Sequence, residues 1–94
     1  MIVYFEWDEE KINANIRKHG FDFAIAWKLF EGPMLIRPDL RFDYGEQRFI
    51  GIGFLDDRIV LVAFSEPDEI TKRIISLRRA KKNERAKFEN RIKD

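Results

Sequence analysis

Residues 46–64 read EQRFIGIGFLDDRIVLVAF. Two runs rich in β-branched and aromatic residues flank the pair Asp56-Asp57, and this arrangement predicts two antiparallel strands, 46–55 and 58–64, joined by a tight turn. The run 59–64 is apolar at every position. A strand without polar alternation is expected at the centre of a sheet with both of its faces covered, so the second strand should be central.

Alternation along the first of these strands separates its two faces. Gly51 and Gly53 share one face, where their missing side chains leave room for a closely packed helix. The other face is expected to carry one arginine and three large apolar side chains, namely Arg48, Ile50, Ile52 and Phe54.

A strand and two helices are expected before this hairpin. Residues 2–5 are typical of a short strand. Asp8 is placed to cap a helix that ends at Gly20, because glycine readily takes the left-handed conformation that follows a helix. Asp22 can cap a second helix, which the pair Gly32-Pro33 ends.

Helical spacing assigns faces to both of these helices. In the first helix the expected core stripe consists of Ile12, Ile16 and His19, and the polar stripe beside it of Lys11, Asn15 and Lys18. In the second helix the expected core stripe consists of Phe23, Ala26, Trp27 and Phe30. Ile25 and Leu29 fall on nearly the opposite side, so this helix is either buried on two faces or offers one of them to a partner.

The chain after Pro33 is expected to form two further strands and a final helix. Residues 34–37 and 71–77 are typical of strands, and residues 66–69 of a loop. A terminal helix is expected to begin at about Arg78. Its narrow apolar stripe would consist of Leu77, Ala80, Phe88 and Ile92.

Glu84 lies in the middle of that apolar stripe. An unpaired carboxylate in such surroundings is strongly unfavourable, so Glu84 requires a cationic partner. Arg48 or Arg73 could supply it.

Positive charge is concentrated at the end of the chain. Residues 72–94 hold ten Lys or Arg against three acids, a net charge of +7, whereas residues 1–71 hold eight against fourteen, a net charge of −6. On the terminal helix the spacing predicts one basic face formed by Arg78, Lys81, Lys82 and Arg85. Such a face is typical of phosphate-binding surfaces; an ordinary solvated helix is the alternative.

Length and composition limit the class of protein. The 94 residues predict a single domain, 1–94, because so short a chain cannot bury two separate cores. The chain has no cysteine and one histidine, which excludes thiolate clusters and multi-histidine metal sites, and we expect neither metal nor cofactor. The longest apolar run has six residues and no signal peptide is recognisable, so a soluble cytoplasmic protein is expected, with no membrane contact.

Three blocks of sequence occur in an order that is specific in combination. The first comprises Phe5-Glu6-Trp7-Asp8, Lys11, Asn15 and Lys18-His19-Gly20; the second comprises Asp43-Tyr44-Gly45-Glu46, Arg48 and Gly51-Ile52-Gly53; the third comprises residues 73–80, RIISLRRA, and Glu84. Together they resemble the BrnT toxins of BrnT/BrnA toxin–antitoxin modules, which are RelE-like ribonucleases.

The resemblance implies a small α+β, RelE-like domain whose twisted, mainly antiparallel sheet is packed by two N-terminal helices and a C-terminal helix. It also implies a metal-independent endoribonuclease that cleaves RNA and inhibits translation until a cognate BrnA-like ribbon-helix-helix antitoxin binds. Operator DNA would be bound only through the toxin–antitoxin complex. The chain departs from the family pattern in two places, since Ser65-Glu66-Pro67 replaces a Thr-x-Arg segment and Phe88 replaces a tyrosine.

Cleavage of RNA without a metal requires deprotonation of the 2′-hydroxyl and stabilisation of a dianionic phosphorane. Guanidinium groups suit the phosphate oxygens. The main candidate phosphate ligands are Arg73, Arg78 and Arg79, and Arg48 comes next. The other candidates for RNA contact are Lys18, Lys81, Lys82 and Arg85.

His19 is the one residue whose ordinary pKa lies near neutrality, which makes it the candidate for proton transfer. A histidine that fixes the turn at Gly20 is the alternative. Glu84 could act as a base or form a structural pair with an arginine. Three functions remain open: an endoribonuclease toxin, an inactive antitoxin partner and co-repressor, and an independent DNA-binding regulator, which is the least favoured because no helix-turn-helix spacing is present.

Overall fold

The computed structural model of the protein describes residues 2–93. Met1 and Asp94, the ends of the expected domain, lie outside the described residues. The elements along the chain are β1 (Tyr4–Trp7), α1 (Glu9–His19), the 3-10 helix η1 (Phe23–Glu31), β2 (Met34–Pro38), β3 (Arg48–Leu55), β4 (Arg58–Asp68), β5 (Thr71–Arg79) and α2 (Lys82–Lys93).

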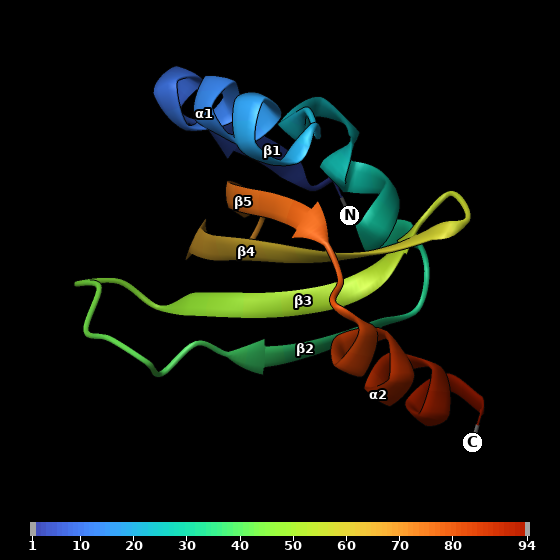
Figure 1. Cartoon of the computed structure of the whole chain (residues 1–94). Helices are drawn as coiled ribbons and strands as arrows, with labels where there is room; N and C mark the ends of the chain where they lie inside the picture. The colour runs from blue at the N-terminus through green and yellow to red at the C-terminus, as the bar shows by residue number, and fades with distance from the viewer. Residues whose placement is uncertain (1, 94) are drawn as a thin grey trace.

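Within residues 2–93 the strands form a five-stranded sheet in the order β1-β5-β4-β3-β2. Among these described strands, β1 pairs parallel with β5, and the other neighbours pair antiparallel. Figure 1 shows α1 beside the β1–β5 side of the sheet and α2 near β2. The expected α+β fold with a mainly antiparallel sheet is therefore confirmed.

The β3–β4 hairpin forms as its sequence predicts. Asp56 takes the left-handed conformation, with φ of 58°, in the tight turn between the two strands. β4 lies between β3 and β5, and its apolar residues from Ile59 to Val62 are buried. A Cβ added at Gly51 would lie 2.7 Å from Met34 Cε, so a β2 side chain fills the space at this glycine. A Cβ added at Gly53 would lie 3.5 Å from Leu29 Cδ2 of η1, so the expected helix packs there.

Both ends of α1 confirm their predicted capping residues. Asp8 Oδ1 accepts a hydrogen bond of 2.8 Å from the N–H of Glu10, and Gly20 is left-handed with φ of 77°. The predicted faces are partly wrong. Asn15 is 6% exposed and lies beside Ile12 in the core, whereas Ile16 is 42% exposed.

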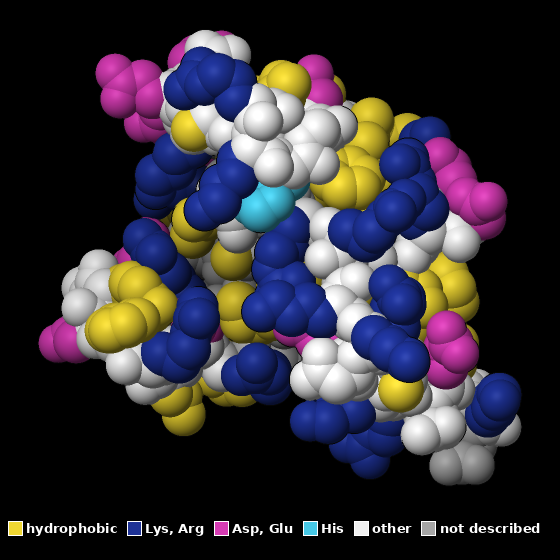
Figure 2. All heavy atoms as spheres, viewed as in Figure 1, with side chains coloured by type: hydrophobic (Ala, Val, Ile, Leu, Met, Phe, Trp, Pro, Cys, Tyr) yellow, Lys and Arg dark blue, Asp and Glu magenta, His cyan; other side chains and the backbone are white. Residues whose placement is uncertain are grey.

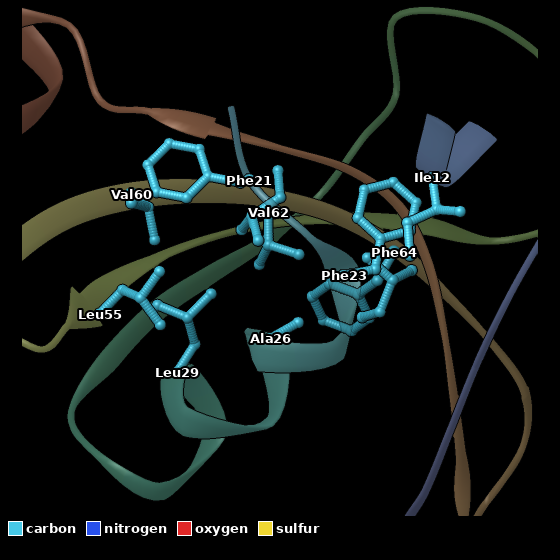
Figure 3. Close-up of a cluster of buried hydrophobic side chains, with 11 residues drawn as sticks. Ile12, Phe21, Phe23, Ala26, Leu29, Leu55, Val60, Val62 and Phe64 are labelled. Carbon is cyan, nitrogen blue, oxygen red and sulfur yellow. The ribbon is translucent and has the colours of Figure 1, made fainter. Parts of the chain in front are cut away.

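The expected second helix is the 3-10 helix η1, and this changes which residues reach the core. A 3-10 helix has about three residues per turn, so Phe23, Ala26 and Leu29 share one face. All three are at most 1% exposed, while Trp27, which α-helical spacing places in the core, is 44% exposed. Figure 3 shows this face of η1 packed against side chains of β4. Leu29 is thus unavailable to a partner.

The strands on either side of the last turn are longer than predicted. β4 continues to Asp68, so most of the expected loop 66–69 is strand, and a register shift between Ser65 and Asp68 accommodates Pro67. β5 continues to Arg79 because its backbone remains paired with β4. Arg78 therefore lies on a strand, and the prediction that it shares a helical face with Lys81, Lys82 and Arg85 is wrong.

The helices cover opposite faces of the sheet. Ile12 of α1 and the buried face of η1 pack on the face that carries Val60, Val62, Phe64, Ile74 and Leu77. On the other face, fully buried Phe88 anchors α2 against Leu35, Ile52 and Phe54. In the described part of the chain no helix is long and apolar enough to cross a membrane.

Candidate functional site

The sheet face on which α2 lies carries four arginines, and we call it the basic face: Arg37, Arg48, Arg73 and Arg78. Directly opposed residues of an antiparallel pair project to the same face. The register opposes Arg48 to Ser65, and Ser65 to Arg73, in one row across β3, β4 and β5. Figure 2 shows Lys and Arg side chains spread over this side of the molecule, with the histidine among them.

Arg78 forms a bidentate ion pair with Glu84. Arg78 Nη1 donates to Glu84 Oε1 and Nη2 to Oε2, each at 2.9 Å. Glu84 Oε1 also accepts the N–H of Lys81 at 2.7 Å, which is the capping interaction of a glutamate in the first turn of a helix. Glu84 thus joins α2 to β5, and its partner is Arg78 rather than the expected Arg48 or Arg73.

The Arg78 hydrogen bonds lower the pKa of Glu84, an effect that outweighs the opposing influence of burial. The N–H of Lys81 lowers it further. Glu84 is therefore an anion at neutral pH whose oxygens are already engaged. This geometry favours the structural pair over the role of a catalytic base.

Asn15 fixes the strand on which Arg78 lies. Its amide Nδ2 donates to the carbonyl of Leu77 at 2.8 Å, and its Oδ1 accepts the N–H of Leu77 at 3.1 Å. This exchange reproduces the pair of bonds made by a neighbouring strand, and it occurs where β1 has already ended beside β5. Nδ2 also donates to the carbonyl of Phe21 at 3.0 Å. One buried side chain therefore connects α1, the segment after it and β5.

His19, one turn after Asn15, ends α1 and is partly buried. Partial burial lowers the pKa of its imidazole, and the positive charges of Lys18 and Arg78 lower it further. His19 thus lies within the electrostatic influence of Arg78, and it is neutral at neutral pH. A neutral imidazole can accept a proton.

We expect the His19 ring to titrate below its ordinary value of about 6.5, because the folded protein disfavours the imidazolium. Lys18→Gln removes one of the two positive charges near the ring, so the titration midpoint of His19 should rise toward the ordinary pKa of histidine. The chain has a single histidine, so its ring proton resonances can be followed by NMR across pH without ambiguity. Lys11→Gln, on an exposed part of the same helix, provides the control, and a midpoint above 6.5 in the parent protein would contradict the geometry.

A second charged cluster lies where β3 begins. Arg73 Nε donates to Glu6 Oε1 at 2.8 Å, and Arg73 Nη1 contacts Glu46 Oε2 at 3.4 Å. The other carboxylate oxygen of Glu46 is 3.4 Å from Arg48 Nε, and the Arg48 guanidinium lies over the Tyr44 ring at 4.1 Å. Glu46 therefore bridges the two arginines Arg48 and Arg73.

The loop between β2 and β3 is held by a carboxylate. Asp39 is 6% exposed and accepts two hydrogen bonds from the Arg41 guanidinium, of 2.8 and 2.9 Å, and one from the Tyr44 hydroxyl at 3.1 Å. The Arg41 hydrogen bonds hold the pKa of Asp39 well below its usual range. This ionised carboxylate positions Tyr44, and so supports Arg48.

The remaining predicted RNA contacts lie at several different places around Arg78. Arg79 opposes Val60 and so projects to the other sheet face. Lys81 and Lys82 are exposed at the start of α2, and Lys18 is exposed on α1 beside His19. Arg85 is partly buried, and its Nη1 donates to the carbonyl of Ala80 at 3.2 Å.

A groove of about 700 Å³ separates α2 from the sheet. Its floor is formed by Leu35, Ile50, Ile52 and Leu61, and its rim includes Arg37, Glu84, Lys87 and Arg91. The described residues contain no group of three or more His, Cys, Asp or Glu side chains placed to hold a metal ion.

The sequence did not predict the contacts that three residues make at this face, namely Asn15, Tyr44 and Glu46. Asn15 falls three residues after Ile12, a spacing that could have placed it on the core face. Tyr44 and Glu46 belong to the second sequence block, but the sequence contains no signal that pairs either of them with an arginine.

Comparison with known proteins agrees with this fold. No curated protein matches the chain. Among solved structures it is similar to the 1.1 Å crystal structure of the Brucella abortus ribonuclease toxin BrnT, with a TM-score of 0.71 and 29% sequence identity. The alignment covers 85% of this chain and 99% of that one.

The family model described as the ribonuclease toxin BrnT of type II toxin–antitoxin systems matches residues 7–84. The match includes the elements from α1 to β5 and ends at Glu84, the partner of Arg78. By this match the chain belongs to the BrnT family of ribonuclease toxins of type II toxin–antitoxin systems.

Proposed function

We propose that this chain is a metal-independent, RelE-like endoribonuclease that cleaves RNA at the end of β5 and thereby inhibits translation in the cytoplasm. The observation that carries the proposal is the juxtaposition of a neutral histidine with a fixed guanidinium. His19 lies one turn after Asn15 on α1, and Asn15 bonds the backbone of Leu77, the residue before Arg78. The positive charge of Arg78 also contributes to lowering the pKa of His19. A base and an electrophilic group in one place are what metal-free phosphodiester cleavage requires.

In this reaction the His19 imidazole accepts the proton of the 2′-hydroxyl, and the 2′-oxygen attacks the adjacent phosphorus. The bond from phosphorus to the 5′-oxygen breaks, and this oxygen takes a proton from solvent. The products are a 2′,3′-cyclic phosphate and a 5′-hydroxyl end. Charge builds up on the phosphorane oxygens, where Arg78 and Lys18 can stabilise it.

Arg78 retains donors for this purpose. A guanidinium has five N–H bonds, and three are used, two for Glu84 and one for the carbonyl of Arg79. Within residues 2–93, the Nε–H and one Nη2–H have no partner. Because Glu84 fixes the plane of the group, these donors are oriented before RNA binds, which reduces the entropy lost on binding.

The test is incubation of the purified protein with single-stranded RNA in excess EDTA. The expected result is cleavage that persists without metal and yields 2′,3′-cyclic phosphate ends, together with growth arrest when the chain is expressed alone. A matched sample carrying His19→Gln, which keeps a polar side chain but cannot accept the proton, should lose cleavage. Intact RNA with the parent protein at high concentration would refute the proposal.

The regulatory partner that we propose is a BrnA-like ribbon-helix-helix antitoxin, which would bind operator DNA as a complex with this chain. A second candidate function is that of an inactive toxin that serves only as antitoxin partner and co-repressor. Its support is Pro67, which stands where the family pattern has an arginine, and the neutralisation of Arg78 by Glu84. In that case the complex forms and binds DNA, whereas RNA stays intact.

A further inference from the structure

Glu46 occupies a slot between two arginines, and it is held there weakly. Each of its oxygens is 3.4 Å from its arginine nitrogen, Arg48 Nε on one side and Arg73 Nη1 on the other. Good charged hydrogen bonds are about 2.7–2.9 Å long. The neighbouring contact from Arg73 Nε to Glu6, at 2.8 Å, meets that standard. Glu46 is therefore the readily displaced anion of the pair.

A free hydroxyl lies in the same row of the sheet. Ser65 is directly opposite both Arg48 and Arg73, so all three side chains project to the basic face. Ser65 is 1% exposed, and within residues 2–93 its Oγ has no hydrogen-bond partner. Buried hydroxyls nearly always have a partner, and an orphan is unfavourable. The row thus presents two guanidinium groups and one unused donor.

Aromatic side chains adjoin this slot on the β2–β3 loop. Tyr44 lies under the Arg48 guanidinium, and the Phe42 ring packs edge-on against Tyr44 at 5.8 Å between centroids. Phe42 is 69% exposed. Aromatic rings beside a basic groove are typical of surfaces that bind single-stranded nucleic acid, because bases stack on the rings while arginines contact phosphate. The surroundings therefore favour a phosphodiester over a protein carboxylate.

We propose that Arg48, Ser65 and Arg73 form a phosphate subsite for RNA, distinct from the Arg78 site, and that Glu46 fills it in the free protein as an internal competitor. A phosphate oxygen takes the position of each Glu46 oxygen, and the Ser65 hydroxyl donates to the phosphate. When Glu46 leaves, the two arginines are balanced only by the single negative charge of Glu6. The subsite therefore has a net charge of about +1 toward its ligand. The identity of the ligand rests on the proposed function.

The experiment measures binding of a labelled, mixed-sequence 2′-O-methyl RNA 12-mer by fluorescence anisotropy at fixed salt. This probe lacks the attacking hydroxyl, so its affinity is independent of whether the protein cleaves. Glu46→Gln should tighten binding by roughly 3- to 10-fold, because a weakly held surface carboxylate no longer competes.

Glu6→Gln is the matched control, since it removes the same charge from the same arginine but lies outside the slot. It should change the affinity by less than about 2-fold. In the Arg48→Ala background, Glu46→Gln should produce a smaller gain, because Glu46 then contacts only Arg73. Equal gains from the two glutamate variants would show a general charge effect and overturn the proposal.

Ser65→Ala separates binding from folding. It should weaken binding of the 12-mer by roughly 3- to 10-fold while the melting temperature stays the same or rises, since an unsatisfied buried hydroxyl is removed. Unchanged affinity in a folded Ser65→Ala protein would overturn the role of the hydroxyl. If Glu46→Gln tightens binding of a polyglutamate peptide and leaves the RNA affinity unchanged, the slot takes a carboxylate and the RNA subsite is refuted.

Discussion

Arg78→Ala is expected to lower the rate of RNA cleavage by roughly 10²- to 10³-fold, the loss typical of removing one donor to a transition-state oxyanion. The Nε–H and the free Nη2–H of Arg78 disappear together, and Glu84 loses the cation that neutralises it. Cleavage of a fluorogenic RNA under single-turnover conditions measures the effect on the chemical step. Growth arrest on expression should be relieved in parallel.

Arg79→Ala is the matched control for this substitution. Arg79 is the next residue of the same strand and carries the same charge, but it projects to the opposite face. Its loss should change the rate by less than about 3-fold. Arg78→Lys keeps the charge but cannot form the bidentate pair, so its cleavage rate should lie between those of the parent protein and Arg78→Ala. Equal losses in the two alanine variants would show that only the total charge matters and would remove Arg78 from the reaction.

Asn15→Ala is expected to lower the free energy of unfolding by about 2–4 kcal/mol. The substitution leaves the N–H and C=O of Leu77 and the C=O of Phe21 without their partner in a buried position. Urea denaturation followed by circular dichroism measures the change. Cleavage should fall as well, because β5 carries Arg78 and α1 carries His19.

Asn13→Ala on the same helix removes the same side chain from an exposed position. Alanine is the better helix former there, so the free energy of unfolding should stay within about 0.5 kcal/mol of the parent value. If Asn15→Ala is no more destabilising than Asn13→Ala, Asn15 does not act as the missing strand neighbour.

Much of the fold could be predicted because its signals are local. The Asp56-Asp57 turn, the caps Asp8 and Asp22 and the left-handed Gly20 each depend on a few adjacent residues. The apolar run of β4 could be placed at the sheet centre because a strand buried on both faces has no polar alternation.

The errors arose where distant contacts override local spacing. The 3-10 geometry of η1 buries Leu29 in the core and leaves Trp27 exposed. Both residues are apolar, so the sequence does not distinguish between them. β5 extends to Arg79 because pairing with β4 continues past Leu77, the residue whose backbone Asn15 binds. The basic residues that follow favour a helix when considered by themselves, and the sequence does not show where the pairing stops.

The candidate site was predictable in its residue types and not in its pairings. An excess of Lys and Arg near the end of the chain indicates a phosphate-binding surface, whichever strand or helix those residues belong to. The choice of Arg78 as the partner of Glu84, and of Glu46 as a bridge, depends on which side chains the sheet brings together. Those partners come from β5 and α2 in one case and from three separate segments in the other.

The parallel pairing of β1 with β5 also concerns the synthesis of the protein. Glu6 and Arg73, which lie side by side in this pair, are 67 residues apart. β1 can join the sheet only after β5 has been synthesised, because this pairing links segments far apart in the chain. Until β5 has emerged from the ribosome, β1 lacks its partner strand, so a nascent chain exposes an unpaired strand edge for as long as β5 is missing.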